Sequence, residues 1–256
     1  MNEREPLTTC PLARRAVRAI VLDAGGVVLY PNLDWIAARA ALIDRQNPLT
    51  RDQLFFAYYR TIAEVDLAES PIGGRGGPAL TSLEIRVWFF SHLLAHAGLR
   101  QAELIGRRLA EQAQECFPRE SDIYHWAMPG VREELEGLRR AGYLLGMASN
   151  NDGALCDQLR CVGIYDLFSP AALMDSGVEG VAKPDPELPL RAARALGVPP
   201  ARCLFIGDVD RVDGAAARAA GMPFALLDPL GQGRPARPLV IGGLAAIEDH
   251  FVATAE

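Results

Sequence analysis

Five side chains in this sequence have the types needed for chemistry on a phosphate group. Three are carboxylates, at Asp23, Asp208 and Asp213, and the others are the hydroxyl of Ser149 and the ammonium of Lys183. Neighbouring carboxylates repel one another unless a cation lies between them, and ligand sets made only of oxygen suit a hard ion such as Mg²⁺. The hydroxyl and the ammonium would then face the anion that the metal holds, which is the equipment for phosphoryl transfer.

Strand ends are expected to bring these residues together. Apolar runs at Ile20–Leu22, Tyr143–Ala148 and Cys203–Ile206 are typical of strands buried on both faces, and each is followed, directly or after one glycine, by a residue of this set. The carboxyl ends of parallel strands meet at one edge of a sheet, where open α/β sheets bind ligands. Lys183 lies in a loop that feeds the same face, and Asp213 lies where the third strand's loop enters a helix.

Lysine usage singles out one position. Of 26 basic residues, only Lys183 is a lysine and the rest are arginines. A coding bias toward arginine would replace lysine wherever the two are interchangeable, and they are not interchangeable where a compact ammonium charge is needed. We therefore expect position 183 to require an ammonium group.

Periodicity divides the chain into a core and an insertion. Residues 33–128 show helical spacing of apolar residues, and from residue 129 onward strands and helices alternate, which predicts a parallel sheet with right-handed crossovers. We predict an α/β fold with a Rossmann-like three-layer core, residues 1–32 and 129–256, and an all-helical cap domain, residues 33–128. The cap helices are predicted at about 34–44, from 50, at 81–97 and at 101–116.

The same patterns predict the remaining elements. Residues 1–17 are expected to form a loose arm, and 70–78 a loop because of their glycines and prolines. Helices are predicted at 131–142, 153–162, 186–196, 213–220 and 243–252, a strand at 224–227, and short strands at Leu167–Phe168 and within Ala171–Met174.

Composition excludes several classes of partner. The net charge is -6, so the basic footprint of a nucleic-acid-binding protein is absent. No apolar run approaches the roughly 18 residues of a membrane-spanning helix, and the apolar stretch near the N-terminus is broken by Asp23, as in a core strand rather than a signal peptide. We expect a cytoplasmic monomer or homodimer that acts on a small molecule and binds neither nucleic acid nor membranes.

Four segments, in order, resemble the motifs of the haloacid dehalogenase superfamily. A strand ending in D-x-D-G-[TV] corresponds to D-A-G-G-V at 23–27, and a strand ending in Ser or Thr corresponds to Ser149 in M-A-S-N-N. The family's lysine, often followed by proline, corresponds to Lys183, and G-D-x-x-x-x-D corresponds to 207–213. Any one motif is weak, but four in order at strand ends are specific, and 33–128 matches a helical cap inserted after the first motif.

The resemblance implies a role for each matching residue. Asp23 would be the nucleophile, would pass through an aspartyl-phosphate and would bind Mg²⁺ together with the backbone carbonyl of Gly25, with Asp208 and with Asp213. Ser149 would hydrogen-bond the phosphoryl group and Lys183 would steady the nucleophile. Substrate contacts are expected from Gly26, Asn150, Tyr30 and Trp35, which lie beside these motifs or where the chain enters the cap.

Gly25 is the departure from the pattern. Phosphatases of the family usually have an aspartate here that protonates the leaving group, and a positioned acid contributes roughly 10²–10⁴-fold to the rate. The favoured interpretation is a Mg²⁺-dependent phosphatase of a small phosphorylated metabolite, such as a sugar phosphate, whose leaving group needs little protonation. Alternatively, the substrate or a cap residue such as His92 or His96 supplies the proton, or the protein is a catalytically weak binding or regulatory protein. A metal-free 2-haloacid dehalogenase is a further alternative, which the intact Gly207–Asp208 pair opposes.

Overall fold

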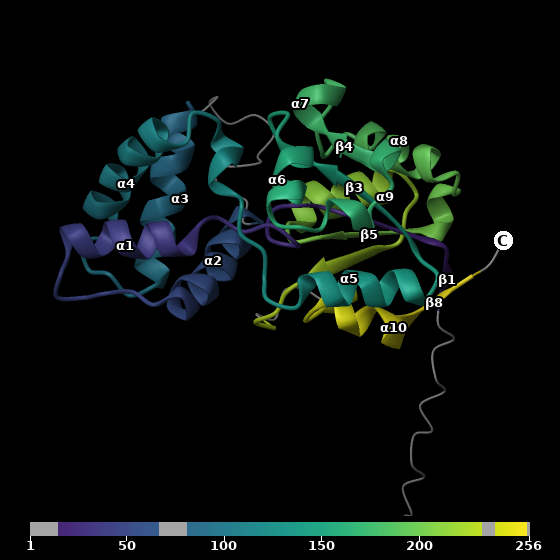
Figure 1. The fold of residues 1–256 in the computed structure, drawn as a ribbon, viewed down its shortest axis with the longest axis horizontal. Coiled ribbons are helices and arrows are strands. Elements are labelled where there is room, and N and C mark those ends of the chain that lie inside the picture. The colour runs from purple at the N-terminus through teal and green to yellow at the C-terminus, as the bar shows by residue number, and fades with distance from the viewer. Residues whose placement is uncertain (1–14, 67–80, 232–238, 255–256) are drawn as a thin grey trace, which may run out of the picture.

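The computed structural model describes residues 15–66, 81–231 and 239–254. Within these ranges the chain forms an α/β core with a lobe of helices beside it (Figure 1). The core strands are β2 (Ala19–Leu22), β3 (Leu144–Ser149), β4 (Leu173–Asp175), β5 (Cys203–Gly207), β6 (Phe224–Leu227) and β7 (Leu239–Ile241). They pair in the order β4-β3-β2-β5-β6-β7, and every pairing is parallel.

The central strand β2 explains why the apolar runs are continuous. All four of its residues are buried, and it pairs with β3 on one side and β5 on the other. Ile20 and Leu22 pack into the hydrophobic cluster on one face of the sheet, and Ala19 and Val21 pack into the cluster on the opposite face. Because both faces are covered, no position of the strand is left for a polar residue until Asp23.

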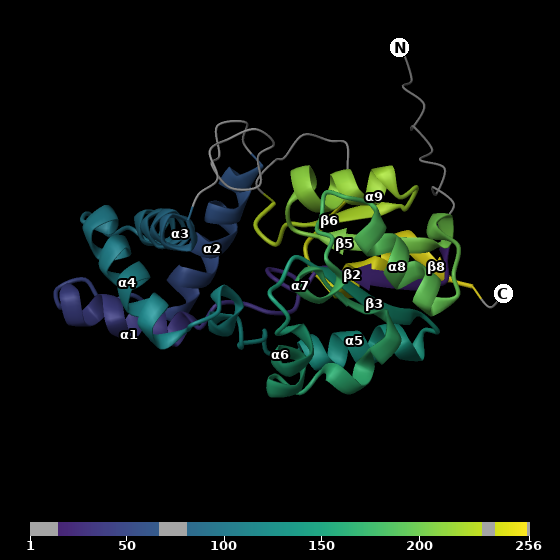
Figure 2. The same ribbon diagram turned by 90° about the horizontal axis from the view of Figure 1, so that it is seen from above.

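Helices cover both faces of the sheet (Figure 2). Helices α5 (Val131–Arg140), α6 (Leu155–Cys161) and α10 (Ile247–His250) contribute to the cluster that holds Ile20 and Leu22. Helices α8 (Glu187–Leu196) and α9 (Ala215–Ala219) contribute to the opposite cluster. The predicted three-layer α/β core is confirmed.

The helical lobe has a hydrophobic core of its own, which includes Tyr58, Phe90 and Leu109. Thr50 and Thr81 precede the second and third helices of the lobe and form capping boxes. In each box the threonine hydroxyl accepts the backbone N–H of the Gln or Glu three residues later, and the side chain of that Gln or Glu accepts the backbone N–H of the threonine. The helices are α1 (Leu33–Ile43), α2 (Arg51–Val65), α3 (Ser82–His96) and α4 (Ala102–Cys116). All four lie where the periodicity predicts them.

Two sequence predictions in the core are wrong. Leu167, predicted to lie in a strand, ends a short 3₁₀ turn at Tyr165–Leu167, and Phe168 follows it. Both apolar side chains are buried. An apolar run of two residues does not distinguish a buried turn from a strand. The predicted helix 243–252 is instead a 3₁₀ turn (Leu244–Ala246), then α10, then β8 (Phe251–Ala253). A tertiary pairing overrides the helical spacing there.

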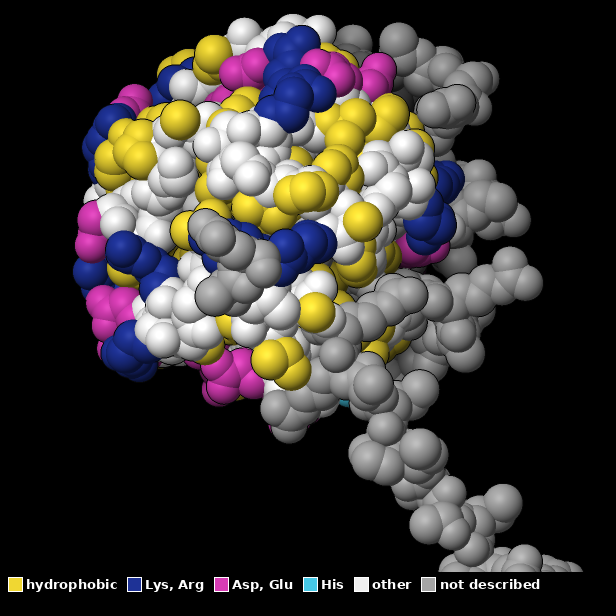
Figure 3. Space-filling model, turned by 90° about the vertical axis from the view of Figure 1, so that its right-hand side faces the viewer, with side chains coloured by type: hydrophobic (Ala, Val, Ile, Leu, Met, Phe, Trp, Pro, Cys, Tyr) yellow, Lys and Arg dark blue, Asp and Glu magenta, His cyan; other side chains and the backbone are white. Residues whose placement is uncertain are grey.

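That pairing involves the N-terminal arm. β8 pairs in parallel with β1 (Arg15–Val17), so the last residues of the predicted loose arm form a strand. Figure 3 looks at this end of the molecule, opposite the helical lobe, where hydrophobic and charged side chains are interspersed on the visible face. The rest of the arm and the predicted loop 70–78 lie outside the described residues. Among the described helices, none is long and apolar enough to cross a bilayer.

Candidate active site

Three strand ends converge at one edge of the sheet. β2 lies between β3 and β5, so Asp23 follows the central strand, while Ser149 ends one neighbour and Asp208 follows the other. The backbone N–H of Asp23 donates to the carbonyl of Ile206 at 2.8 Å, which extends the pairing with β5 to the base of the site. Ser149 and Asp208 are buried, and Asp23 keeps 14% of its side chain exposed. The structure therefore brings Asp23, Ser149 and Asp208 to neighbouring strand ends, as the sequence predicts.

Lys183 bridges two of the carboxylates. Its Nζ lies 2.7 Å from Oδ1 of Asp23 and 2.7 Å from Oδ1 of Asp213, and its side chain is 1% exposed. Burial alone would lower the pKa of Lys183, but the carboxylates of Asp213 and Asp23 outweigh it and raise the pKa to about 12. The ammonium is therefore a permanent positive charge beside Asp23, not a base.

Asp213 is held by its own loop. A single turn of π-helix, Asp210–Gly214, carries it, and its Oδ2 accepts the backbone N–H of Val209 at 3.1 Å. Burial raises the pKa of Asp213, Lys183 opposes that rise, and the nearby Asp23 adds to it. A second positive charge in the site would favour the ionised form of both carboxylates.

Asn150 positions the lysine loop. Its side-chain Nδ2 donates to the backbone carbonyl of Lys183 at 2.9 Å, and its Oδ1 accepts the backbone N–H of Lys183 at 2.8 Å. The residue predicted to bind substrate thus uses both ends of its amide on the neighbouring loop, while also lining the cavity beside Asp23. Asn150 thus holds the backbone of Lys183 directly and positions the ammonium through it.

The two glycines of the first motif have different surroundings. Gly26 has φ +70°, and a Cβ placed on it would lie 1.8 Å from Oδ2 of Asp208 and 2.9 Å from the hydroxyl of Tyr58. No side chain fits there, so Gly26 lets the backbone approach Asp208 closely. At Gly25 a Cβ would meet only Cε1 of Tyr124, at an ordinary 3.7 Å. The space of the absent aspartate is therefore bordered by a tyrosine.

Tyr30 and Trp35, both expected to contact substrate, make their contacts with other protein groups. The hydroxyls of Tyr30 and Tyr59 lie 3.2 and 3.0 Å from the carbonyl oxygen of Gly26 and also hydrogen-bond each other, so the pair supports the turn at Gly26. Trp35 packs edge-on against Phe117, with ring centroids 5.2 Å apart. Neither is among the described residues that line the cavity at Asp23.

A cavity of about 560 Å³ opens over Asp23, Ser149 and Lys183. Both parts of the molecule line it: α2 contributes Tyr58, Ile62 and Val65, and the segment returning from the lobe to the core contributes Ser121 and Tyr124. Neither Tyr58 nor Tyr124 is among the site residues predicted from the sequence. No local signal marks them, because their proximity to the motifs arises only from how the lobe lies on the core.

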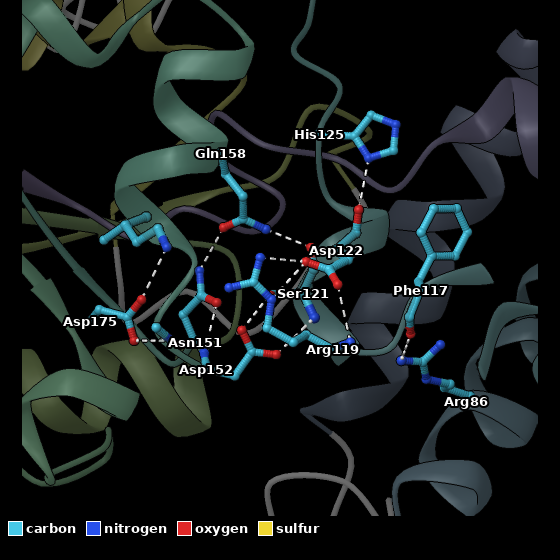
Figure 4. A network of polar contacts seen from close by, with 12 residues as sticks. Arg86, Phe117, Arg119, Ser121, Asp122, His125, Asn151, Asp152, Gln158 and Asp175 are labelled. Atoms are coloured by element: carbon cyan, nitrogen blue, oxygen red, sulfur yellow. Dashed lines mark hydrogen bonds and ion pairs between the residues drawn. The ribbon is translucent and has the colours of Figure 1, made fainter. Parts of the chain in front are cut away.

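Two carboxylates tie the lobe to the core. Asp66, which follows α2, accepts backbone N–H groups from Asp210 at 3.1 Å and Arg211 at 2.9 Å, at the start of the turn that carries Asp213. On the other side of the cavity, Asp152 accepts the backbone N–H of Ser121 at 3.2 Å and also its hydroxyl (Figure 4). The lobe is thus fixed to both loops that flank the site.

His92 and His96, considered as sources of the missing proton, are engaged elsewhere. Both bond to Glu64 between α2 and α3, His96 through Nε2 at 2.8 Å and His92 through Nδ1. Neither is among the described residues that line the cavity at Asp23. The pair is accounted for as a link within the helical lobe.

The carboxylates fit a hard cation. Asp23, Asp208 and Asp213 each offer an oxygen within 4.8 Å of the others. Apart from the ammonium of Lys183, the buried Oδ1 atoms of Asp23 and Asp213 have no hydrogen-bond partner among the described residues, so both retain capacity for a positive charge. A ligand set made only of carboxylate oxygens suits a hard cation such as Mg²⁺.

Comparison with known proteins supports this assembly. A model of the haloacid dehalogenase-like hydrolase family matches residues 17–221, which is most of the chain. The chain belongs to this family. The resemblance inferred from the four motifs is thereby confirmed, and the matched range contains every residue of the candidate site.

Relatives of this haloacid dehalogenase-like hydrolase include phosphatases. The chain is 38% identical over 124 residues to a phosphatase of Mycobacterium tuberculosis (strain CDC 1551 / Oshkosh), covering 47% of this chain and 55% of that protein. It is 38% identical over 122 residues to a plasmid-encoded phosphoglycolate phosphatase of Cupriavidus necator, covering 47% of this chain and 51% of that protein. The chain thus spans about half the length of these curated relatives.

Solved structures share the fold of this hydrolase. A haloacid dehalogenase-like phosphatase from Thermococcus onnurineus matches with a TM-score of 0.53 at 18% identity, over 91% of this chain and 96% of that chain. A 2-haloacid dehalogenase from Pseudomonas syringae pv. Tomato matches with a TM-score of 0.52 at 22% identity, over 91% and 97%. The fold is common to both chemistries, so the choice between them rests on the site.

Proposed function

We propose that this hydrolase is a Mg²⁺-dependent phosphatase of a small phosphorylated metabolite. The observation that carries the proposal is the geometry around Asp23: a strand-end carboxylate with an ammonium 2.7 Å away and two further carboxylates within 4.8 Å. A metal-free dehalogenation would have no use for three clustered carboxylates, whereas a phosphate monoester needs its charge neutralised before an anionic nucleophile can approach. The phosphatase names among the relatives support the same choice.

Asp23 would act as the nucleophile. One carboxylate oxygen attacks phosphorus, the bond from phosphorus to the substrate's leaving oxygen breaks, and an aspartyl-phosphate forms. Lys183, permanently charged, holds the carboxylate in place, and Ser149 donates a hydrogen bond to the phosphoryl group. Water then attacks the phosphorus of this intermediate, which releases inorganic phosphate and restores Asp23.

The metal site would consist of Asp23, Asp208, Asp213 and the carbonyl of Gly25. Mg²⁺ held there supplies positive charge that neutralises the phosphate and draws it toward the nucleophile. The close approach of Gly26 to Asp208 fixes the turn that presents the carbonyl, so the first and fourth motifs are held together.

The leaving oxygen needs a contact that Gly25 cannot provide. Tyr124 borders that space, and the ring atom that faces it is bonded to the carbon that bears the hydroxyl. We place the leaving group beside Tyr124 and propose that its hydroxyl hydrogen-bonds the leaving oxygen. A sugar phosphate or acyl phosphate whose leaving group needs little protonation remains the favoured substrate type, and the phosphoglycolate phosphatase relative names another candidate.

The boundaries of the lobe are part of the proposal. Residues 33–128 would form a cap that closes over the cavity, and residues 1–32 with 129–256 would form the catalytic core. Support comes from the separate hydrophobic cluster of α1 to α4 and from the cap residues Tyr58, Ile62 and Val65 in the cavity wall.

Phosphate release tests the proposal. A sugar 1-phosphate, an acyl phosphate, phosphoglycolate and p-nitrophenyl phosphate would be assayed with and without Mg²⁺, using the wild type, Asp23→Asn and the exposed control Asp157→Asn. We expect Mg²⁺-dependent release that falls roughly 10³-fold or more in Asp23→Asn, on the scale of removing a nucleophile, and is unchanged in the control. Chloride release from a 2-chloro acid without Mg²⁺ would establish the dehalogenase instead, and no turnover of any compound would favour the catalytically weak binding protein.

A further inference from the structure

A second, smaller cavity lies inside the helical lobe beside the site. Its volume is about 190 Å³, and it shares Ile62, Val65 and Tyr124 with the cavity over Asp23. At about 30 Å³ for each water-sized group, it has room for about six such groups. Because Tyr124 also borders Gly25, the two cavities adjoin where the leaving group is placed.

The walls of this inner cavity are mostly apolar, and Arg86 is the one charged residue among the described residues that line it. Apolar side chains of α3, including Trp88 and Phe89, form part of the wall. Arg86 is also on α3, and only 8% of this residue is exposed. A buried cationic residue thus lines a mostly apolar cavity next to the site.

Arg86 lacks the anion that a buried guanidinium normally has. Its Nη2 donates to the backbone carbonyl of Phe117 at 2.9 Å (Figure 4), and its Nε is buried without a hydrogen-bond partner. Among the described residues no carboxylate forms an ion pair with it, in contrast to the arginines that pair with Asp34, Glu179 or Asp166. Burying an unpaired charge is costly, so a bound anion would lower the free energy of this arrangement.

We propose that the inner cavity is a subsite for the substrate's leaving group and that Arg86 binds a second anionic group on it, a carboxylate or a second phosphate. This inference rests on the proposed phosphatase activity and narrows it: a sugar phosphate fits only if it carries a further negative charge. Arginine suits this task because its planar fork binds carboxylate and phosphate with two hydrogen bonds. The apolar walls would accept a short carbon chain between the two anions.

Matched substrates test the subsite. Phosphoglycolate would be compared with 2-hydroxyethyl phosphate, which lacks the carboxylate, and a terminal alkanediol bisphosphate with the corresponding monophosphate; p-nitrophenyl phosphate is the reference. We expect the wild type to favour the member of at least one pair that carries the second anionic group. Arg86→Gln should raise KM for that member roughly 10–100-fold, Arg86→Lys should recover part of the loss, and KM for the partner that carries only the one phosphate should change less than threefold. The exposed Arg140→Gln serves as the matched control.

Binding gives a second measure that does not depend on turnover. In the presence of Mg²⁺, the compound with the second anionic group should raise the Tm of the wild type more than its partner does, and Arg86→Gln should remove that difference. Equal effects of Arg86→Gln on both members of each pair, or no preference by the wild type in kinetics or in Tm, would overturn the subsite. Absence of phosphate release from every compound, in the wild type as in the variants, would instead refute the phosphatase, and the Tm comparison would still decide the role of Arg86. If Arg86→Gln does not fold, the wild-type preference and Arg86→Lys decide it.

Discussion

Asn150 holds Lys183 by both backbone groups of that residue, accepting its N–H at 2.8 Å and donating to its carbonyl at 2.9 Å. The lysine side chain in turn reaches both Asp23 and Asp213. Asn150, which follows Ser149, therefore fixes the loop of Lys183. The side chain of Lys183 then links Asp23 to Asp213. One amide side chain thus aligns groups from four separate strand ends and loops.

We predict that Asn150→Ala lowers turnover with little loss of stability. The ammonium would no longer be held in register with the nucleophile, and misplacement by about 1 Å can cost about 10²-fold. Phosphate-release kinetics should show kcat reduced roughly 10–100-fold, with Asn47→Ala, an exposed asparagine, unchanged. A kcat within twofold of the wild type would mean that the lysine loop is positioned without this amide.

Replacing Lys183 should destabilise the protein in a metal-dependent way. Lys183→Met leaves the carboxylates of Asp23 and Asp213 without their ammonium, and removing one partner of a buried ion pair costs about 3–5 kcal/mol. Urea unfolding should show this loss without metal, and Mg²⁺ should restore more stability to the variant than to the wild type. The exposed Arg140→Met serves as the control. If Mg²⁺ raises the free energy of unfolding equally in the wild type and in Lys183→Met, no cation binds at these carboxylates.

The adjacent glycines should respond differently to alanine. Gly26→Ala forces a Cβ to within 1.8 Å of Asp208 Oδ2 at a φ of +70°, so we expect a loss of roughly 1–3 kcal/mol and of most activity. Gly25→Ala meets only an ordinary contact at 3.7 Å and should fold like the wild type. Thermal unfolding of the two variants side by side is the measurement, and equal stabilities would contradict the close approach at Gly26.

Gly25→Asp should add the missing acid. The backbone allows it, since the φ of Gly25 lies outside the left-handed region and its nearest neighbour is Tyr124. We expect kcat on an alkyl phosphate to rise roughly 10-fold or more, and kcat on p-nitrophenyl phosphate, whose leaving group needs no proton, to stay within about twofold. Tyr124→Phe in the wild type should show the reverse, a loss confined to the alkyl phosphate. If each variant changes kcat equally on the alkyl phosphate and on p-nitrophenyl phosphate, neither side chain contacts the leaving oxygen.

Much of this arrangement could be predicted from the sequence, for a physical reason. β2, β3, β5 and β6 are buried on both faces, so their apolar runs are continuous, and the polar residue that ends each run marks the edge where ligands bind. The helices of the lobe carry amphipathic spacing and capping threonines. Local patterns of this kind are readable without a structure.

What could not be predicted depends on contacts between distant segments. Tyr124 borders Gly25, and Arg86 lines the inner cavity, only because of how the lobe packs on itself and on the core. The pairing of β1 with β8 rests on strands of three residues, too short to show a period. Tyr30 lies where the chain enters the lobe, as expected, yet its hydroxyl contacts the carbonyl of Gly26 and the residue is not among those that line the cavity.

Glu64 should make the stability of the lobe depend on pH. Burial alone would raise the pKa of Glu64, but hydrogen bonds from His92 and His96 lower it below its ordinary 4.5. A lowered folded-state pKa stabilises the protein fully above the unfolded value, and this stabilisation is lost as the pH falls below about 4.5. Glu64→Gln should therefore cost up to about 1 kcal/mol near neutral pH, because the groups are partly exposed.

Urea unfolding at several pH values would measure this difference. The gap between the wild type and Glu64→Gln should narrow as the pH falls below about 4.5. Glu115→Gln, an exposed residue on α4, provides the control. A gap that stays constant across this range would show that Glu64 contributes by packing and not by its charge.

Trapping the phosphoenzyme tests the central claim most directly. The protein would be mixed with its best substrate and Mg²⁺, quenched in acid within the first turnover, digested, and analysed by mass spectrometry. We predict one added phosphoryl group on the peptide that contains Asp23, present in Asp157→Asn and absent in Asp23→Asn. Turnover of the substrate with no phosphoryl group on that peptide, or with the group on another residue, would contradict Asp23 as the nucleophile.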